Sequence, residues 1–430
     1  MWQPQDPADD SMAGDFEAEQ PHRWPLGCMI WSAGAMGLLI TLAVLSVPVV
    51  QQARARAAIQ AVGGSIELAD EPFAWLAWLG DSVGVPLLFP VGHIDLDGCV
   101  VNDDTWQAVL HVAGPQLQVV WVDGTGLTDQ QLAELTERAP GLLWLTALES
   151  RLTNQGLASL ARCPELNNLA IDSPQLSAGW VGDLPPLKSL TGIELSDIVW
   201  DEATVASISR CTSLDTLALT RATFPRQAPS ADWSPPAPSL RALSITDSTL
   251  TEAGLELLGH SGALHTLHFS EVTFPASGCR HLARLKHLDE LSLYACRISD
   301  ECVAELASCT SLGSVALWNS PVNGACLESL SRLPELVALD LDGTTVQAEQ
   351  LKYLADYPKL ESLDLTNTSL TDEAIPHLER CRKLTVLLLS GSRITADGLK
   401  RLKASLPGCE VAHDIAESPG AALHNGPIVN

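Results

Sequence analysis

The chain has 430 residues, with 52 Asp or Glu against 25 Lys or Arg, and its formal net charge is −27 at pH 7. Such acidity argues against binding to nucleic acid, because contacts with phosphates require clustered Lys and Arg. It favours a basic protein or peptide as partner through weak electrostatic steering, although the same acidity also serves solubility alone.

The N-terminal part of the chain predicts a tail followed by a membrane anchor. Residues 1–24 are acidic and predict a disordered tail. No charged residue lies between Arg23 and Arg54, and the apolar run 25–50 is long enough to cross a bilayer of about 30 Å. We therefore expect one transmembrane helix at residues 25–50, with the lipid bilayer as a partner and a single-pass membrane localisation.

Two questions about this segment stay open at the level of sequence. A cleaved signal peptide is the alternative to an anchor, but it would begin with basic residues and have a shorter apolar run. Arg23 lies before the predicted helix, whereas Arg54 and Arg56 lie after it. An excess of one positive charge leaves the side of the membrane undecided.

Residues 51–90 predict a linker and an N-terminal cap. Residues 53–62 have a helical pattern that ends at Gly63 and Gly64, and residues 65–68 form a candidate strand. The aromatic run 73–79 predicts an apolar helix that covers the start of the domain at 91–411. A role for its two Trp residues at a membrane surface is the rival interpretation.

A ladder of regularly spaced apolar residues runs through 91–411, and most of its steps are 24 residues long. Its members are Val91, Leu117, Leu142, Leu166, Leu190, Leu214, Leu240, Leu264, Leu288, Leu312, Leu336, Leu360 and Leu384. In the unit that starts at Leu360, apolar residues follow at offsets 3, 5, 10, 15 and 18. The first two alternate as in a strand and the last two share a helix face, so each unit predicts a strand, a turn and a helix. Only stacked units bury such faces.

This ladder resembles a leucine-rich repeat array, whose repeats begin with Leu-x-x-Leu-x-Leu. The resemblance implies an α/β solenoid, a right-handed horseshoe with a parallel β-sheet on its concave face and helices on its convex face. It covers 91–411 and predicts thirteen strand positions. The Leu-Thr-Asp sequence at 127–129 and 370–372 resembles the repeat variant of bacterial membrane-anchored repeat proteins and the cysteine-containing repeats of ubiquitin-ligase adaptors.

Two features of the repeats depart from or refine that pattern. The family's Asn at offset 8 or 9 is here mostly Thr, Ser or Cys, as in Thr125, Ser150 and Cys296, and small hydroxyls or thiols can bond to the backbone of the turn. Thr128 and Gln131 predict a capping box at the start of a helix.

Prolines interrupt the repeat at two places. Residues 224–238 hold too many prolines for a helix and predict an irregular loop on the convex side. This loop is either a partner-binding protrusion around Trp233 or a tolerated insertion. Pro185 and Pro186 predict a shortened helix in the unit that starts at Leu166.

The 11 cysteines show no framework spacing. Cys163, Cys211, Cys309 and Cys381 occupy one repeat-equivalent position, and Cys302 and Cys326 share another. Equivalent positions in stacked repeats indicate packing, so we predict small buried thiols with no disulfide and no zinc site.

No catalytic or phosphate-binding motif is present, so we expect no enzyme activity, no cofactor and no metal. The two Asp-Leu-Asp-Gly stretches, 95–98 and 340–343, resemble the start of a calcium loop, but the later ligands of such a loop are missing. Paired Asp at those offsets is better explained as a solvated face. The end of the chain, 412–430, has no apolar period and predicts a disordered tail.

The residues that the repeat does not dictate are the outward strand positions, at offsets 2, 4 and 6. They predict a protein-binding concave face that mixes aromatic rings and carboxylates, as interface hot spots do. Its candidate residues are Trp121, Trp144, Asp172, Glu194, His268, Tyr294, Trp318, Asp340, Asp342 and Asp364. We therefore expect a non-enzymatic recognition module. The alternatives are an adaptor that presents a partner to other machinery, or an enzyme with a site in the cap or the 224–238 loop.

Overall fold

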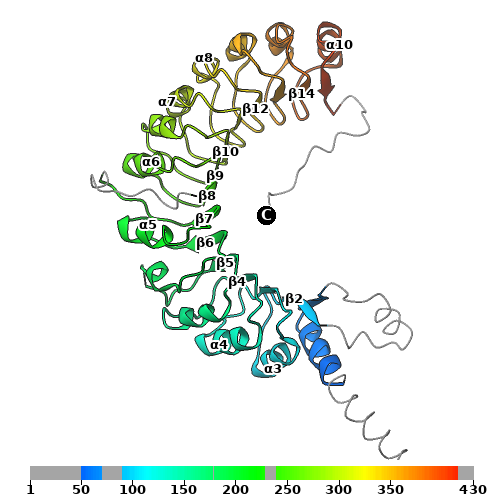
Figure 1. Ribbon diagram of the computed structural model, residues 1–430. Helices are drawn as coiled ribbons and strands as arrows, with labels where there is room; N and C mark the ends of the chain where they lie inside the picture. Colours follow the sequence, from blue (N-terminus) through cyan, green and yellow to red (C-terminus); the bar gives the residue numbers. More distant parts are fainter. Residues whose placement is uncertain (1–49, 70–89, 178, 228–238, 415–430) are drawn as a thin grey trace, which may run out of the picture.

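The computed structural model describes residues 50–69, 90–177, 179–227 and 239–414. These residues form one sheet of fifteen strands, which follow each other in sequence order. Figure 1 shows the strands along the inner side of an arc and the helices along its outer side. This is the predicted α/β solenoid of the leucine-rich repeat type.

Each predicted strand position has a strand, β2 to β14, and one further strand, β15, closes the last unit. Consecutive strands from β2 to β15 pair in parallel, and β1 pairs antiparallel with β2. The strands are β1 Ser65–Leu68, β2 Val91–Asp95, β3 Val119–Trp121, β4 Trp144–Ala147, β5 Asn168–Ile171, β6 Gly192–Ser196, β7 Thr216–Thr220, β8 Ala242–Thr246, β9 Thr266–Ser270, β10 Glu290–Tyr294, β11 Ser314–Ala316, β12 Ala338–Asp340, β13 Ser362–Asp364, β14 Val386–Leu388 and β15 Glu410–Ala412.

The convex side consists of both α-helices and 3₁₀ helices. Residues 50–61 are also helical and precede β1. The α-helices are α3 Asp103–Val112, α4 Asp129–Arg138, α5 Glu202–Ile208, α6 Glu252–Leu258, α7 Asp300–Glu305, α8 Leu327–Leu330, α9 Ile375–Leu378 and α10 Ala396–Ser405. The 3₁₀ helices are η2 Gly156–Arg162, η3 Trp180–Asp183, η4 Cys279–Arg284, η5 Leu306–Ser308, η6 Ala348–Asp356 and η7 Asp372–Ala374.

Capping side chains accompany the longer α-helices. Each labelled α-helix of six residues or more follows a residue whose side chain accepts a backbone N–H of the first turn, and the predicted capping box of Thr128 and Gln131 is present. No such bond precedes η2, η3, η4 or η6. A cap offsets part of the cost of the first turn, which favours the α-helical form in the capped units. The unit with Pro185 and Pro186 has only the four-residue η3, as predicted.

The core is a continuous row of apolar side chains between the sheet and the helices. Every ladder residue from Val91 to Leu384 is at most 4% exposed. Because each ladder leucine packs against its equivalents in the neighbouring repeats, removing one side chain costs about 3 to 5 kcal/mol and damages two interfaces.

A left-handed residue ends almost every strand segment, at offset 7, and turns the chain out of the sheet. Gly98, Gly124, Gly343 and Gly391 adopt positive φ there. The other residues with positive φ at this offset are Glu149, Asp197, Arg221, Asp247, Glu271, Ala295, Asn319 and Asn367. The hydroxyls at offset 8 then bond to the turn, as Thr344 Oγ1 does to the Leu341 carbonyl at 2.6 Å. Small hydroxyls therefore replace the family's Asn in this turn.

One disulfide corrects the prediction for the cysteines. Cys279 at the start of η4 and Cys302 in α7 form a disulfide across two neighbouring repeats, with their Cα atoms 5.4 Å apart. The two residues occupy offsets 15 and 14 of their units, so their sequence positions are not equivalent, and stacking alone brings them together. The thiols at the repeat-equivalent position are free, as predicted, and burial raises the pKa of Cys163 to about 11 and those of Cys309 and Cys381 to about 12.

The expected transmembrane helix at residues 25–50 is also corrected. Among the residues that the structure describes, no helix is long and apolar enough to cross a membrane. The helix at 50–61 is short and carries Arg54 and Arg56. The expectation used only the length and apolarity of a run of sequence, neither of which specifies a helix. The fold is therefore a repeat solenoid without a preceding membrane-spanning helix in its described part, and residues 25–49 lie outside that part.

Other expectations also fall outside the described residues. These are the acidic tail 1–24, the aromatic lid 73–79, residues 228–238 of the loop expected at 224–238, and residues 415–430 of the tail expected at 412–430. The first residues of that expected tail are ordered instead, because Ala412 ends β15 and His413 is buried. The described parts of the cap match the prediction, because residues 50–61 are helical and β1 is a strand. Ile59 is fully buried, and Gly64 lies so close to it and to Leu96 that a Cβ would clash with both. The cap helix thus closes the first repeat.

Ala295 tests the cost of the left-handed position. Its φ of 49° is unfavourable for any residue with a Cβ. We expect Ala295→Gly to raise the free energy of unfolding by about 0.5 kcal/mol, since the relief of strain exceeds the added freedom of the unfolded chain. The control is Ala338→Gly, in strand β12, which should lower stability by about 0.5 to 1 kcal/mol. Urea denaturation measures both, and equal losses would contradict the strain.

The disulfide makes a larger prediction. Replacing Cys279 and Cys302 together by Ser should lower the free energy of unfolding by about 3 kcal/mol, because the bond closes a loop with a sequence separation of 23 residues. Urea denaturation with and without reductant measures the effect, and reductant should abolish the difference between variant and parent. Thiol titration of the unfolded parent should count two more thiols after reduction. An unchanged count would exclude the bond.

Candidate functional site

The register of the sheet aligns the outward side chains into columns on the concave face. Asp95, Trp121 and Thr146 are direct neighbours on β2, β3 and β4, and Ala316, Asp340 and Asp364 are neighbours on β11, β12 and β13. Every predicted candidate lies on a strand or within two residues after one. All are partly buried except Tyr294, which is 41% exposed. The structure thus places the predicted residues on one continuous surface.

Three rings at the N-terminal end of this surface form a group that we call the aromatic corner: His93, Trp121 and Trp144. The ring centroids of Trp121 and Trp144 are 6.0 Å apart, with planes at 70°. The imidazole of His93 lies 4.4 Å from the Trp121 ring, with planes at 73°. Edge-to-face contacts of this kind hold aromatic rings in fixed relative orientations. The corner is therefore a preorganised apolar feature on an otherwise polar face.

A second group, which we call the acidic end cluster, lies toward the C-terminus: Trp318, Asp340, Asp342 and Asp364. Burial raises the pKa of Asp340 to about 6. Hydrogen bonds from the Trp318 indole and the Asp342 backbone lower this pKa, and repulsion from the charges of Asp364 and Asp342 raises it. Burial likewise raises the pKa of Asp364. Asp342 accepts a hydrogen bond from Asn367 Nδ2 at 2.9 Å. Three carboxylates are thus held close together beside one ring.

Two predicted carboxylates lie between these groups. Asp172 forms an ion pair with Arg221 at 3.1 Å, and Arg221 also pairs with Asp197 at 2.7 Å. Burial raises the pKa of Asp172, and Asp197 raises it further, whereas Arg221 lowers it. Burial also raises the pKa of Glu194, and the charge of Asp123 adds to the shift. Asp172 is therefore engaged within the protein, whereas Glu194 has no ion pair within the described residues.

The structure does not join the remaining two candidates to either group. His268 lies on β9, where burial lowers its pKa and Glu290 on the next strand opposes the shift. Tyr294 ends β10 and projects from the face. Between the two groups the central column consists largely of small residues: Ala170, Ala218, Ser244, Ser292 and Ala316. Small side chains therefore leave the middle of the face open.

The paired aspartates serve the turns that come after their strands. Asp95 accepts the Asp97 N–H at 3.0 Å, and Asp340 accepts the Asp342 N–H at 2.9 Å. No group of three His, Cys, Asp or Glu side chains in the described ranges has the arrangement to hold a metal ion. These carboxylates stabilise turns, as local side-chain hydrogen bonds do.

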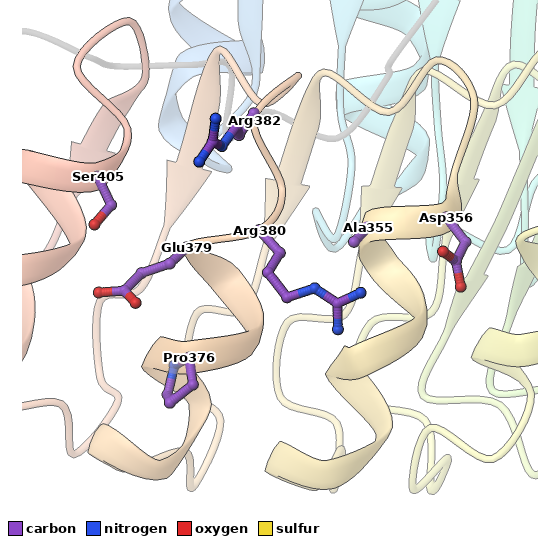
Figure 2. A pocket seen from close by; sticks show the side chains of 7 residues that line it. All are labelled: Ala355, Asp356, Pro376, Glu379, Arg380, Arg382 and Ser405. Atoms are coloured by element: carbon purple, nitrogen blue, oxygen red, sulfur yellow. The ribbon is translucent and has the colours of Figure 1, made fainter.

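Three open hollows of the described residues lie away from the concave columns. Figure 2 shows one of about 610 Å³, where Arg380 extends between neighbouring helical segments. It is lined by Ala355, Asp356, Pro376, Glu379, Arg380, Arg382 and Ser405. Glu379 is already paired with Arg401 at 3.3 Å. This open hollow is lined mainly by charged side chains, whereas ligand pockets are enclosed and predominantly apolar.

Sequence reasoning missed two members of this surface. His93 completes the aromatic corner, and its position at offset 2 of the first unit was a readable signal, since it matches that of Trp144. Arg221 neutralises Asp172 from offset 7 of a different repeat, two units along the chain. No sequence pattern indicated that contact, because it depends on the left-handed turn at Arg221.

Comparisons with known proteins find likenesses among solved structures alone. No protein-family model matches the sequence, and no curated protein matches it. Among solved structures, an internalin (inlF) from Listeria monocytogenes is 18% identical with a TM-score of 0.48, covering 81% of this chain and 96% of its own. A leucine-rich repeat protein from Leptospira interrogans is 19% identical with a TM-score of 0.41, covering 74% of this chain and 87% of its own.

A third structure, TLR13 in complex with ssRNA13, is 17% identical with a TM-score of 0.45 and covers 73% of this chain and 48% of its own. All three TM-scores lie below 0.5, so none of these likenesses indicates what this chain binds. The fold assignment comes from its own strand order and register.

Asp340 predicts a pH dependence of stability. The pKa of Asp340 in the folded state, about 6, lies above the usual 3.8. The stability that its protonated carboxyl contributes to the folded state is therefore complete below pH 3.8 and is lost as the pH rises through 6. Asp340→Asn cannot ionise and should exceed the parent in stability at about pH 8, by on the order of 1 kcal/mol after allowance for solvent screening. The gain should shrink toward about pH 4.

Urea denaturation across that pH range measures the effect. The exposed Asp356 provides the matched control, and Asp356→Asn should show no comparable pH-dependent gain. A gain for Asp340→Asn that is the same at both ends of the range would show that burial of its charge is not the cause.

Proposed function

We propose that this protein is a non-enzymatic recognition module whose concave face binds a basic protein or peptide. One observation carries the proposal: no Lys or Arg occupies an outward position, at offset 2, 4 or 6, in strands β2 to β15. Acidic residues at those positions are Asp95, Asp97, Asp123, Asp172, Glu194, Glu290, Asp340, Asp342, Asp364, Glu410 and Asp414. A face of one charge sign attracts a partner of the other sign.

Aromatic residues supply the contact area that charge alone lacks. Trp121, Trp144 and Trp318 stand among these carboxylates with part of each side chain exposed. Trp is enriched among the residues that dominate binding energy, because it buries a large area and carries a polar N–H. The negative charge of the face therefore favours a positively charged partner. The aromatic rings favour a protein or peptide over a small cation.

The same charges disfavour two other partners. An RNA or DNA backbone would place phosphates against carboxylates, with Arg221 as the neighbouring cation on the face and already paired twice. A small-molecule substrate would need an enclosed pocket, and the hollows that the structure describes are open. Recognition of an extended basic surface is the function that this geometry suits best.

A capture experiment tests the proposal. The full chain is immobilised, and bound proteins are compared with those retained by the double variant Trp318→Ala with Asp342→Lys, which removes a ring and reverses a charge. We expect the variant to lose most of the partner, because it loses contact area and repels a basic surface.

The matched control reverses a charge on the opposite side of the molecule. Glu301 is exposed on the convex helix α7, so Glu301→Lys should retain the partner. Raising the salt concentration should weaken capture by the parent, since exposed charge pairs are screened. Equal capture by all three proteins would exclude the concave face as the binding surface.

A further inference from the structure

Buried polar atoms at and beside the aromatic corner have no hydrogen-bond partner among the residues that the structure describes. These atoms are Trp121 Nε1, His93 Nε2 and Thr146 Oγ1. Thr146 is the direct neighbour of Trp121 on the adjacent strand. A buried polar atom without a partner costs about 1 to 3 kcal/mol, and most such atoms in proteins are paired. Three such atoms lie around one pair of tryptophans, so a ligand that forms hydrogen bonds with them would stabilise this part of the protein.

The hydrogen-bond state of His93 defines what that ligand offers. His93 Nδ1 lies 3.4 Å from Glu67 Oε2 on β1, so Nδ1 carries the proton that faces the carboxylate. In the neutral ring Nε2 is then an acceptor, and the hydroxyl of Thr146 can also accept. These two atoms require a donor, whereas the indole N–H of Trp121 requires an acceptor.

Carboxylates surround the corner. Asp95 is the register neighbour of Trp121, and Asp123 follows Trp121 by two residues. Asp97 accepts the backbone N–H of Asp123 at 2.9 Å, and burial raises the pKa of Asp97, with the charges of Asp123 and Asp95 adding to the shift. These charges repel one another, and no ion pair with Lys or Arg is formed by any of the three in the part of the chain described here. A cation at the corner would relieve the repulsion.

A guanidinium group fits these requirements better than an ammonium group. It is planar and stacks on indole faces, and its five N–H donors form a fork that can reach two acceptors at once. The side chains of Trp121 and Trp144 are partly exposed and their ring planes lie at 70°, so one indole can contact the face of the guanidinium and the other its edge. The backbone carbonyl of the same arginine residue supplies the acceptor for Trp121.

We propose that the aromatic corner of His93, Trp121 and Trp144, with Asp95 and Asp123, is the anchor site for an arginine side chain of the partner. This inference rests on the proposed function, because it assigns one residue type of the basic partner to one end of the concave face. The guanidinium lies against Trp144 and Trp121 and donates to His93 Nε2 and Thr146 Oγ1. The carboxylates of Asp95 and Asp123 balance its charge.

The test uses two small peptides that differ only in charge. The full chain, labelled with ¹⁵N in its tryptophans, is titrated with acetyl-Gly-Gly-Arg-Gly-Gly-amide and with its citrulline counterpart, which is neutral and nearly the same shape. The indole N–H signals are assigned by replacing Trp121, Trp144 and Trp318 in turn with Phe. We expect the arginine peptide to shift the Trp121 and Trp144 signals with an affinity about 10-fold above that of the citrulline peptide.

Two double variants test which carboxylates contribute to arginine binding through their charge. The first, Asp95→Asn with Asp123→Asn, keeps the acceptor oxygens that receive the backbone N–H groups of Asp97 and Leu148 but removes both charges. It should weaken the arginine peptide by about 10-fold without changing its citrulline counterpart. The same pair of changes at the other end, Asp342→Asn with Asp364→Asn, should leave binding at the corner unaltered. An unchanged thermal midpoint for each variant confirms that it is folded.

The outcomes separate this proposal from the broader one. Equal affinity for the two peptides, or shifts confined to Trp318, would overturn the arginine anchor. If the Trp318 and Asp342 variant still loses the captured partner in that case, the concave face remains the binding surface and only the anchor is excluded. If the corner binds the arginine peptide as expected while capture is insensitive to Trp318 and Asp342, the corner still recognises arginine, but the concave face is excluded as the surface that holds the captured partner.

Discussion

The parallel pairing of each strand with the next repeat holds this molecule together. The hydrogen bonds run at the same register from β2 to β15, so a residue at a given offset always lies beside its equivalent in the next unit. The ladder leucines then stack into one core, although no repeat has a core of its own. Because contacts are made only with neighbouring repeats, the sheet depends on an unbroken succession of units and on closed ends.

The ends and the disulfide reflect that dependence. The antiparallel strand β1 and the helix at 50–61 cover the first unit, and β15 completes the last. The bond between Cys279 and Cys302 joins two adjacent repeats, where uncapped η4 packs against capped α7. A link between neighbours strengthens the one kind of interface on which a solenoid relies. Left-handed residues at offset 7 keep the strands short and the concave face open.

The concave face inherits its chemistry from the same register. Because equivalent offsets align, the acidic residues form two charged regions, separated by the outward positions of β7 to β9, which hold no Asp, Glu, Lys or Arg. Arg221 pairs with Asp172 and Asp197 at the border of the first region. The rings gather at two separate ends, around Trp121 and around Trp318. A long face with one group of side chains toward each end suits an extended partner, and burial raises the pKa of Asp340 and Asp364 in the acidic end cluster.

The sequence by itself determined the period, the thirteen repeat strands and the outward positions, because apolar spacing reports directly which side chains must be buried. It determined the capping box of Thr128 in the same way, since that motif is local. Only the tertiary structure decided the contact of Arg221 with Asp172, the bond between Cys279 and Cys302 and the meeting of His93 with Trp121. Each of these joins different repeats at unlike offsets, so it depends on how far one unit is rotated and shifted against the next, which no spacing within a single unit encodes.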